Sequence, residues 1–189
     1  MARCIAPKTV CIGLIIFFAG AVAFGGIKSF FAYTNQTEFC VSCHSMSTNY
    51  EEYKESLHYK NVAGVRAACA DCHVPEEFME LFKVKMIAAR DVYHEIVGTI
   101  DTEEKFEQRR WLLASRVWER MRSSDSRECK TCHDYDSMDL DEQDKQARRK
   151  HARVAEGDKD KTCIDCHRGI VHEEPLEPDE PTDVASTNR

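Results

Sequence analysis

The chain contains 189 residues, a length that predicts one folded domain with room for a short segment outside it. Its formal charge is -7, because 33 Asp and Glu residues outnumber 26 Lys and Arg residues. This acidic balance argues against nucleic acid as a partner, since proteins that bind nucleic acids concentrate positive charge.

The first predicted element is a helix that spans a membrane. Residues 10–27 form an 18-residue run without a formal charge, which nearly crosses a bilayer core at about 1.5 Å per residue. Lys28 follows the run and can extend its charge to the interface. A cleaved signal peptide is the alternative, because A-V-A at 21–23 resembles a cleavage site, but the apolar run continues past it. We therefore expect residues 1–33 to be retained as a cytoplasmic N-terminus and a transmembrane anchor.

Four copies of the motif Cys-x-x-Cys-His follow the predicted anchor. Two thiols at this spacing can each form a thioether to one porphyrin, and the adjacent imidazole then binds the iron as an axial ligand. Zinc is the rival ligand for paired Cys-x-x-Cys, but zinc sites do not require a His directly after every second Cys. The motifs therefore predict four covalently attached haem c groups. The attachment residues are Cys40, Cys43, His44, Cys69, Cys72, His73, Cys129, Cys132, His133, Cys163, Cys166 and His167.

The haem motifs also predict the compartment of the protein. Covalent haem attachment takes place outside the cytoplasm, so the motifs must lie beyond the membrane. Arg3 and Lys8 precede the apolar run and favour an N-terminus in the cytoplasm. We expect a single-pass protein of the bacterial inner membrane, with residues 34–175 in the periplasm as a tetrahaem cytochrome c domain.

Helices are expected to dominate this domain, because strand signals are nearly absent. From Pro75 the apolar residues recur at helical spacing, which predicts an amphipathic helix that ends near Gly98. A second helix is expected from Asp101 or Thr102 to about Ser123. The predicted fold class is mainly α, with one N-terminal transmembrane helix and a small tetrahaem domain of helices and loops.

A motif, a free His and a second motif occur in this order twice, with His58 in the first copy and His151 in the second. This pattern predicts two dihaem halves related by duplication. We expect a short helix to carry His58, whereas His151 lies in a charged segment. Residues 176–189 form an acidic, Pro-rich tail that is expected to be disordered.

A low-spin haem needs a second axial ligand, and the chain offers several candidates. The His residues outside the motifs are His58, His94, His151 and His172. Bis-His ligation of all four haems is one solution. Haems 1 to 4 are numbered in the order of their motifs. Met46, two residues beyond His44, offers haem 1 a thioether ligand, which would give this haem a higher reduction potential. The residues leave open whether His44 or Met46 ligates haem 1, and His94 is equally well explained as a packing residue.

The chain resembles the NapC/NirT family of membrane-anchored tetrahaem quinol dehydrogenases over about residues 5–175. The resemblance is carried by the single N-terminal membrane helix and by four sequence stretches. They are F-C-V-S-C-H-S-M at 39–46, C-A-D-C-H-V-P at 69–75, G-T-I-D-T-E-E-K-F at 98–106 and C-I-D-C-H-R-G-I-V-H at 163–172.

The resemblance implies a protein that oxidises menaquinol or ubiquinol from the membrane pool at haem 1. The electrons would pass through the other haems to a soluble periplasmic reductase, either a molybdenum enzyme, with nitrate reductase first, or a multihaem enzyme. The resemblance also implies that Met46 can ligate haem 1 in place of His44. Distal ligation of haems 2 to 4 carries over onto His58, His151 and His172, whereas His94 departs from the family pattern.

The quinol site is expected at haem 1 with Lys85 and Asp91, which match residues implicated in quinol binding in the family. Quinol oxidation releases two protons, and a carboxylate with a raised pKa can accept them. Lys85 could hydrogen-bond a quinone oxygen. Six residues on a helix place the two side chains about 120° apart and about 9 Å along the axis, so they could flank a ring without pairing. The alternative is two solvated charges on an amphipathic helix.

Other functions stay open on the sequence. The protein could reduce quinone with electrons from hydroxylamine oxidation, act as a plain anchored electron carrier, or sense a ligand at an open iron. Separately, it could form a homo-oligomer. We also expect acidic groups around the second dihaem half to steer a soluble partner, with an attraction that weakens as salt rises.

Overall fold

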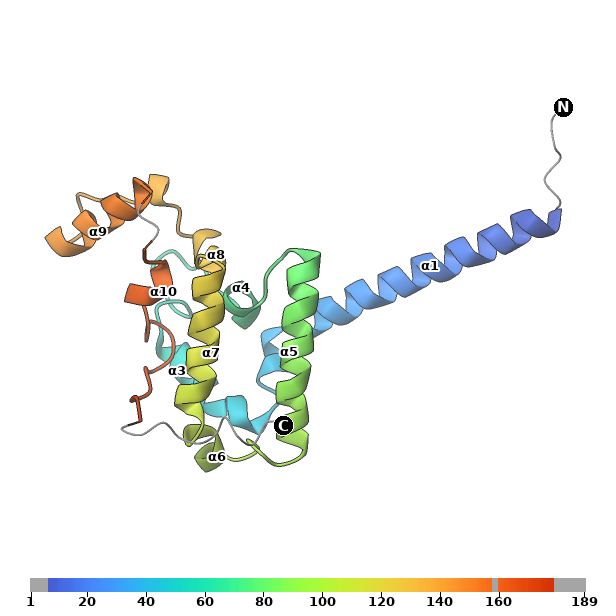
Figure 1. Cartoon of the computed structure of the whole chain (residues 1–189), viewed down its shortest axis with the longest axis horizontal. Coiled ribbons are helices and arrows are strands. Elements are labelled where there is room, and N and C mark those ends of the chain that lie inside the picture. Colours follow the sequence, from blue (N-terminus) through green and yellow to red (C-terminus); the bar gives the residue numbers. More distant parts are fainter. Residues whose placement is uncertain (1–6, 158–159, 179–189) are drawn as a thin grey trace.

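A single long helix, α1 (Pro7–Thr34), projects away from the rest of the molecule (Figure 1). The computed structural model describes residues 7–157 and 160–178, and within them α1 is the one helix long and apolar enough to cross a membrane. Its side chains are exposed along almost the whole length, and Thr34 is buried where the helix meets the domain. An apolar helix without protein around it has the surface that a membrane span requires. The helix predicted at residues 10–27 is therefore confirmed, and it continues beyond that run at both ends.

The domain that follows α1 consists of helices and turns, and its described residues contain no strand, as the sequence predicts. The two longest helices of the domain run antiparallel at its centre, and α9 lies at the end farthest from α1 (Figure 1). The elements are α2 (Thr37–Cys40), η1 (His44–Met46), α3 (Ser47–Glu55), α4 (Cys69–His73), α5 (Phe78–Ile96), α6 (Glu103–Glu107), α7 (Arg110–Ser123), α8 (Arg127–Lys130), η2 (Tyr135–Ser137), α9 (Lys145–Ala155) and α10 (Cys163–Cys166).

Few apolar side chains of the domain are buried by protein. Those in the described residues are Tyr53, Val84, Ile100, Phe106 and Ile164. They come from five separate segments and form no continuous side-chain core. A domain of this size normally buries much more apolar surface, and four porphyrins are large apolar groups that would supply it.

Two predicted helices differ from the structure. The helix expected to carry His58 is α3, which ends at Glu55, because Ser56 is extended with φ -79° and ψ 158°. His58 therefore lies in the turn that follows. The helix expected from residue 101 to 123 is broken into α6 and α7. The break follows from a short i to i−3 hydrogen bond of 2.9 Å, in which Arg109 N donates to the carbonyl of buried Phe106.

The other boundaries agree more closely. The predicted amphipathic helix is α5, which begins three residues after Pro75 and ends two residues before Gly98. Gly98 has φ +76°, a left-handed conformation that glycine adopts without strain and that ends the helix. The charged segment that carries His151 contains α9, which the sequence analysis did not predict. Most of the predicted tail, residues 179–189, lies outside the described residues.

Candidate haem and quinol sites

The structure brings six of the eight His rings together as three pairs. Each pair joins one motif His to one His from outside the motifs. The pairs are His73 with His172, His151 with His167 and His58 with His133, and their ring centroids lie 6.3, 5.9 and 6.2 Å apart, respectively. Two metal–imidazole bonds of about 2 Å each, together with the ring radii, add up to about this separation. The spacing therefore fits one iron atom between the two rings of a pair.

The protein environment keeps several of these rings neutral, the form that binds a metal. Desolvation, together with the neighbouring His172, lowers the pKa of His73 to about 4. Desolvation also lowers the pKa of His172 and of His58. The Nδ1 atoms of His58, His94 and His172 are buried without a hydrogen-bond partner among the described residues, and such atoms are uncommon in folded proteins. The rings of His58 and His172 pair with a motif His, whereas that of His94 does not.

Glu52 on α3 holds His172 opposite His73. Its carboxylate forms an ion pair with Arg110 of α7, and both side chains are largely buried. The same carboxylate accepts a hydrogen bond of 3.1 Å from Glu173 N and lies 3.6 Å from Nδ1 of His172. These contacts tie the segment after the fourth motif to α3 and α7, and no local sequence pattern predicts them.

His151 is oriented by residues near the start of α9. Asp144 caps the helix, because its side chain accepts hydrogen bonds from the backbone N–H groups of Gln146 and Ala147. Nδ1 of His151 lies 2.6 Å from Oε1 of Gln143. An amide oxygen can only accept, so Nδ1 carries the hydrogen and Nε2 remains available as a metal ligand.

The haem motifs lie in pairs along the chain. The Cys40 thiol lies close enough to Cys69 for that neighbour to raise its pKa, and Cys163 raises the pKa of Cys129 in the same way. Fully buried Ser126, which has a left-handed backbone with φ +49°, joins the third and fourth motifs. Its hydroxyl donates to the hydroxyl oxygen of Thr162 at 2.8 Å and accepts from Ile164 N at 3.2 Å. These contacts agree with two dihaem halves.

The free His residues do not follow the predicted duplication. His151 pairs with the fourth motif, which follows it in the chain, whereas His58 pairs with His133 of the third motif. His172 of the second half pairs with His73 of the first. The two halves therefore exchange His partners, because their short segments interlock instead of packing as separate units.

The first motif lacks such a pair, since no second imidazole lies beside His44, which is exposed. Met46 is half-buried on the same 3-10 turn. Glu95 of α5 accepts hydrogen bonds at Oε1 from His44 N at 3.1 Å and Ser45 N at 3.5 Å. Its Oε2 is buried and has no partner in the described part of the chain. Glu95 therefore holds the first motif against α5, a role that the sequence analysis missed.

Helix α5 presents one face to the domain and the opposite face to the surroundings. Val84, Asp91 and Glu95 are spaced so that they share the inner face with Ala88. The apolar side chains on the opposite face remain about half exposed: Phe78, Phe82, Met86 and Tyr93. The ring of Phe78 lies 6.4 Å from that of Phe31 near the end of α1. The exposed apolar face of α5 therefore adjoins the membrane helix.

Lys85 lies where α1, the first motif and α5 meet. Its Nζ donates a hydrogen bond of 2.9 Å to the carbonyl of Thr34, the last residue of α1. Desolvation lowers the pKa of Lys85, although the nearby Cys40 side chain opposes this effect. The side chain is thus only partly exposed and lies within reach of both the first motif and the end of the membrane helix.

Asp91 lies six residues further along α5, close enough to α7 for Arg116 and Arg120 to influence its charge. Its side chain is exposed, yet protein atoms on several sides desolvate it and raise its pKa. Arg90, and then Arg116 and Arg120 of α7, oppose this shift. No contact joins Asp91 to Lys85, as the helical spacing predicts.

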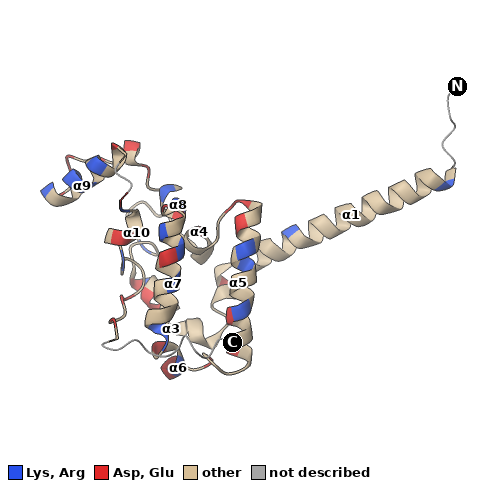
Figure 2. Cartoon of the chain, in the orientation of Figure 1, with Lys and Arg blue, Asp and Glu red and all other residues tan. Residues whose placement is uncertain are grey.

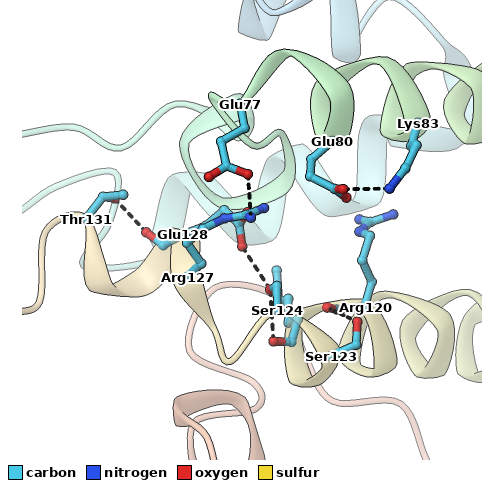
Figure 3. Close-up of polar contacts among 10 residues, drawn as sticks. Glu77, Glu80, Lys83, Arg120, Ser123, Ser124, Arg127, Glu128 and Thr131 are labelled. Atoms are coloured by element: carbon cyan, nitrogen blue, oxygen red, sulfur yellow. Dashed lines mark hydrogen bonds and ion pairs between the residues drawn. The ribbon is translucent and has the colours of Figure 1, made fainter.

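A network of charged and polar side chains joins the start of α5, the end of α7 and α8 (Figure 3). It borders a cavity of about 290 Å³ that is lined by Cys72 and His73 as well as by residues of α5, α7 and α8. Arg127 pairs with Glu77 at 3.4 Å and with Glu128 at 2.9 Å. Figure 3 shows the Arg120 guanidinium pointing from α7 toward α5, and it forms no hydrogen bond or ion pair with the described residues. A haem propionate is a carboxylate that would fit beside it.

Comparisons with known proteins agree with this arrangement of motifs. The model of the NapC/NirT cytochrome c family, N-terminal region, matches residues 5–177. A tetraheme cytochrome-c type protein of Allochromatium vinosum is 60% identical over 165 residues, which cover 87% of this chain and 86% of that protein. The denitrification system component NirT of Stutzerimonas stutzeri is 49% identical, with 83% of this chain and 78% of that protein covered. The cytochrome c-type protein NapC of Escherichia coli is 42% identical, with 89% and 86% covered. The chain belongs to the NapC/NirT family of c-type cytochromes.

Proposed function

We propose that this membrane-anchored cytochrome oxidises quinol beside haem 1 and passes the electrons through its haems to a soluble periplasmic reductase. The observation that carries the proposal is the meeting of α1, the first motif and α5 at Lys85, whose Nζ lies 2.9 Å from the Thr34 carbonyl. A lipid-soluble quinol can reach this junction without leaving the bilayer. Haem iron, when bound, accepts and releases single electrons.

The residues of α5 would handle the protons and the substrate oxygens. Lys85 would hydrogen-bond a quinone oxygen at the end of α1, and Asp91 would accept protons as the quinol is oxidised. The raised pKa of Asp91 suits this role, since a base is most effective when its pKa approaches the working pH. Glu95, on the same face as Asp91, would hold the first motif in place.

The three imidazole pairs support the ligand assignment. We propose His73 with His172 for haem 2, His133 with His58 for haem 3, and His167 with His151 for haem 4. Haem 1 would take Met46, because no imidazole pairs with His44. One haem with its own ligand set, next to the membrane helix, is the one that would meet the quinol.

Membrane topology is part of the proposal. Residues 1–33 would anchor the chain with the N-terminus in the cytoplasm, and residues 34–175 would form the periplasmic haem domain. The exposed apolar face of α5 would lie against the bilayer surface beside α1. The electron acceptor would be a nitrogen-oxide reductase, with nitrate reductase first, because one relative is named a denitrification system component.

The anchor gives a direct test of the topology. The mature protein is expected to keep residues 1–33 and to sediment with membranes, because α1 exposes an uninterrupted apolar surface. Intact-mass spectrometry after detergent extraction measures the N-terminus. A soluble product that begins near Phe24 would contradict the anchor.

The quinol step is tested with the purified protein in detergent. Menadiol is expected to reduce the haems within seconds, with the absorption of reduced haem c as the measurement. Dithionite, which needs no quinol site, provides the value for complete reduction. Full reduction by dithionite with none by menadiol would identify a plain electron carrier and refute the proposed function.

A further inference from the structure

The outer face of α9 carries a row of positive charges in an acidic protein. Lys145, Arg149 and Arg153 are spaced four residues apart, so they share one face of the helix, and Lys150 lies beside them. All four residues are exposed, and α9 contains no acidic residue. Figure 2 shows this concentration of blue along α9 at the tip of the domain.

The opposite face of α9 carries the proposed distal ligand of haem 4. His151 follows Arg149 by two residues, so the two side chains point to nearly opposite sides of the helix. The ring of His151 stacks on that of His167, at a centroid distance of 5.9 Å and an interplanar angle of 25°. The positive row therefore lies directly behind the site at which electrons would leave the chain.

Most of these charges are not neutralised by neighbours. Lys145, Arg149 and Lys150 make no hydrogen bond or ion pair within the described ranges. Arg148, on another side of the helix, does pair with Asp141 at 2.7 Å. Acidic residues precede α9 in segment 134–144 and follow it at Glu156, Asp158 and Asp160, but none lies on the helix itself. The acidic steering expected around this half therefore has the wrong sign for the outer face of α9.

Position and compartment restrict what could bind this face. Helix α9 lies at the end of the domain farthest from α1 (Figure 1), so anionic lipid headgroups are out of reach when α1 spans the bilayer. Nucleic acid is absent from the proposed compartment. A soluble protein with an acidic surface fits both the charge and the position.

We propose that the face formed by Lys145, Arg149, Lys150 and Arg153 is the docking surface for a soluble electron-accepting protein that is acidic around its own redox centre. The inference rests on the proposed function, because quinol electrons need an exit, and His151 links this face to haem 4. Complementary charge accelerates encounter by about 10- to 1,000-fold at low salt and orients the two proteins.

The test measures electron transfer to two protein acceptors of opposite charge. The full-length protein is reduced with dithionite, freed of excess reductant, and mixed with oxidised plastocyanin, which is acidic, or mitochondrial cytochrome c, which is basic. One electron leaves the tetrahaem protein and reduces copper(II) to copper(I) or iron(III) to iron(II). For the double variant Lys145→Glu and Arg149→Glu, the rate with plastocyanin is expected to fall by about tenfold or more at low salt. The rate with cytochrome c is expected to stay equal or rise.

Lys60→Glu with Lys83→Glu is the matched control, since it changes the charge equally at exposed positions outside α9. The rate of electron transfer from this control to plastocyanin is expected to stay within about twofold of the parent rate and to keep the salt dependence of the parent. An unchanged rate in the α9 variant, or an equal fall in the control, would overturn the docking surface. Menadiol reduction of the same proteins is measured separately. If menadiol fails to reduce the haems, the quinol function is refuted. The dithionite-reduced protein still tests the docking surface on α9 in that case.

Discussion

Replacing His172 with Ala is expected to convert one of the four haems from low spin to high spin. His73 would then lack the imidazole whose ring now lies 6.3 Å away, and the iron between them would have one protein ligand. Electron paramagnetic resonance of the oxidised protein measures the change as a new high-spin signal. Covalent haem content is expected to remain at four, because the Cys residues are untouched. Added imidazole is expected to restore the low-spin signal.

The same result is expected for His58→Ala and His151→Ala, each at a different haem. His94→Ala is the matched control, because the ring nearest to His94 is Tyr93, at 5.6 Å, and no imidazole pairs with it. All four haems of this control are expected to keep the spin states of the parent protein. A high-spin haem in His94→Ala, together with an unchanged spectrum in one of the other three variants, would contradict the ligand assignment.

The sequence predicts the local parts of the haem sites and fails where distant segments meet. The Cys and His residues of each motif are local, so their roles follow from spacing alone. The partner of each motif His depends on packing between segments. Glu52 and Arg110, 58 residues apart, direct His172 to the second motif, and no local pattern marks that ion pair.

Helix boundaries show the same division. The apolar run of α1 and the periodic residues of α5 are strong signals, and both helices were predicted. The break between α6 and α7 was not, because the sequence remains suited to a helix through Gln108 and Arg109. A tertiary contact accompanies the break, since the Arg109 guanidinium donates to the carbonyl of Thr99 at 3.1 Å. Glu95 could have been found, because it lies one helical turn from Asp91 on the same face.

Asp91→Asn is expected to slow reduction by menadiol by about 100-fold or more, because removing a general base commonly costs this much. The amide keeps the shape of the side chain but cannot accept a proton from the quinol. Stopped-flow absorbance of the haems measures the rate, and dithionite is expected to reduce all four haems as in the parent protein. Glu119→Gln is the matched control, since it also removes one negative charge. Glu119 is an exposed residue of α7, and its carboxylate forms an ion pair with Arg122 among the described residues. Unchanged menadiol kinetics in Asp91→Asn would refute the proposed role.

The pH dependence separates a base from a merely structural carboxylate. Desolvation raises the pKa of Asp91, so its charged form accumulates only above the ordinary carboxylate pKa of about 4. The menadiol rate of the parent protein is expected to rise with pH through this raised pKa, and the rise is expected to vanish in Asp91→Asn. A raised folded-state pKa also means that the carboxylate weakens folding as pH rises past the unfolded value, with the full loss present above the folded-state pKa. The Asn variant is therefore expected to unfold at an equal or higher temperature than the parent at pH 7, as calorimetry would measure. A residue that lowers stability while it supports the reaction fits a functional site, whereas a lower unfolding temperature in Asp91→Asn would identify a structural role.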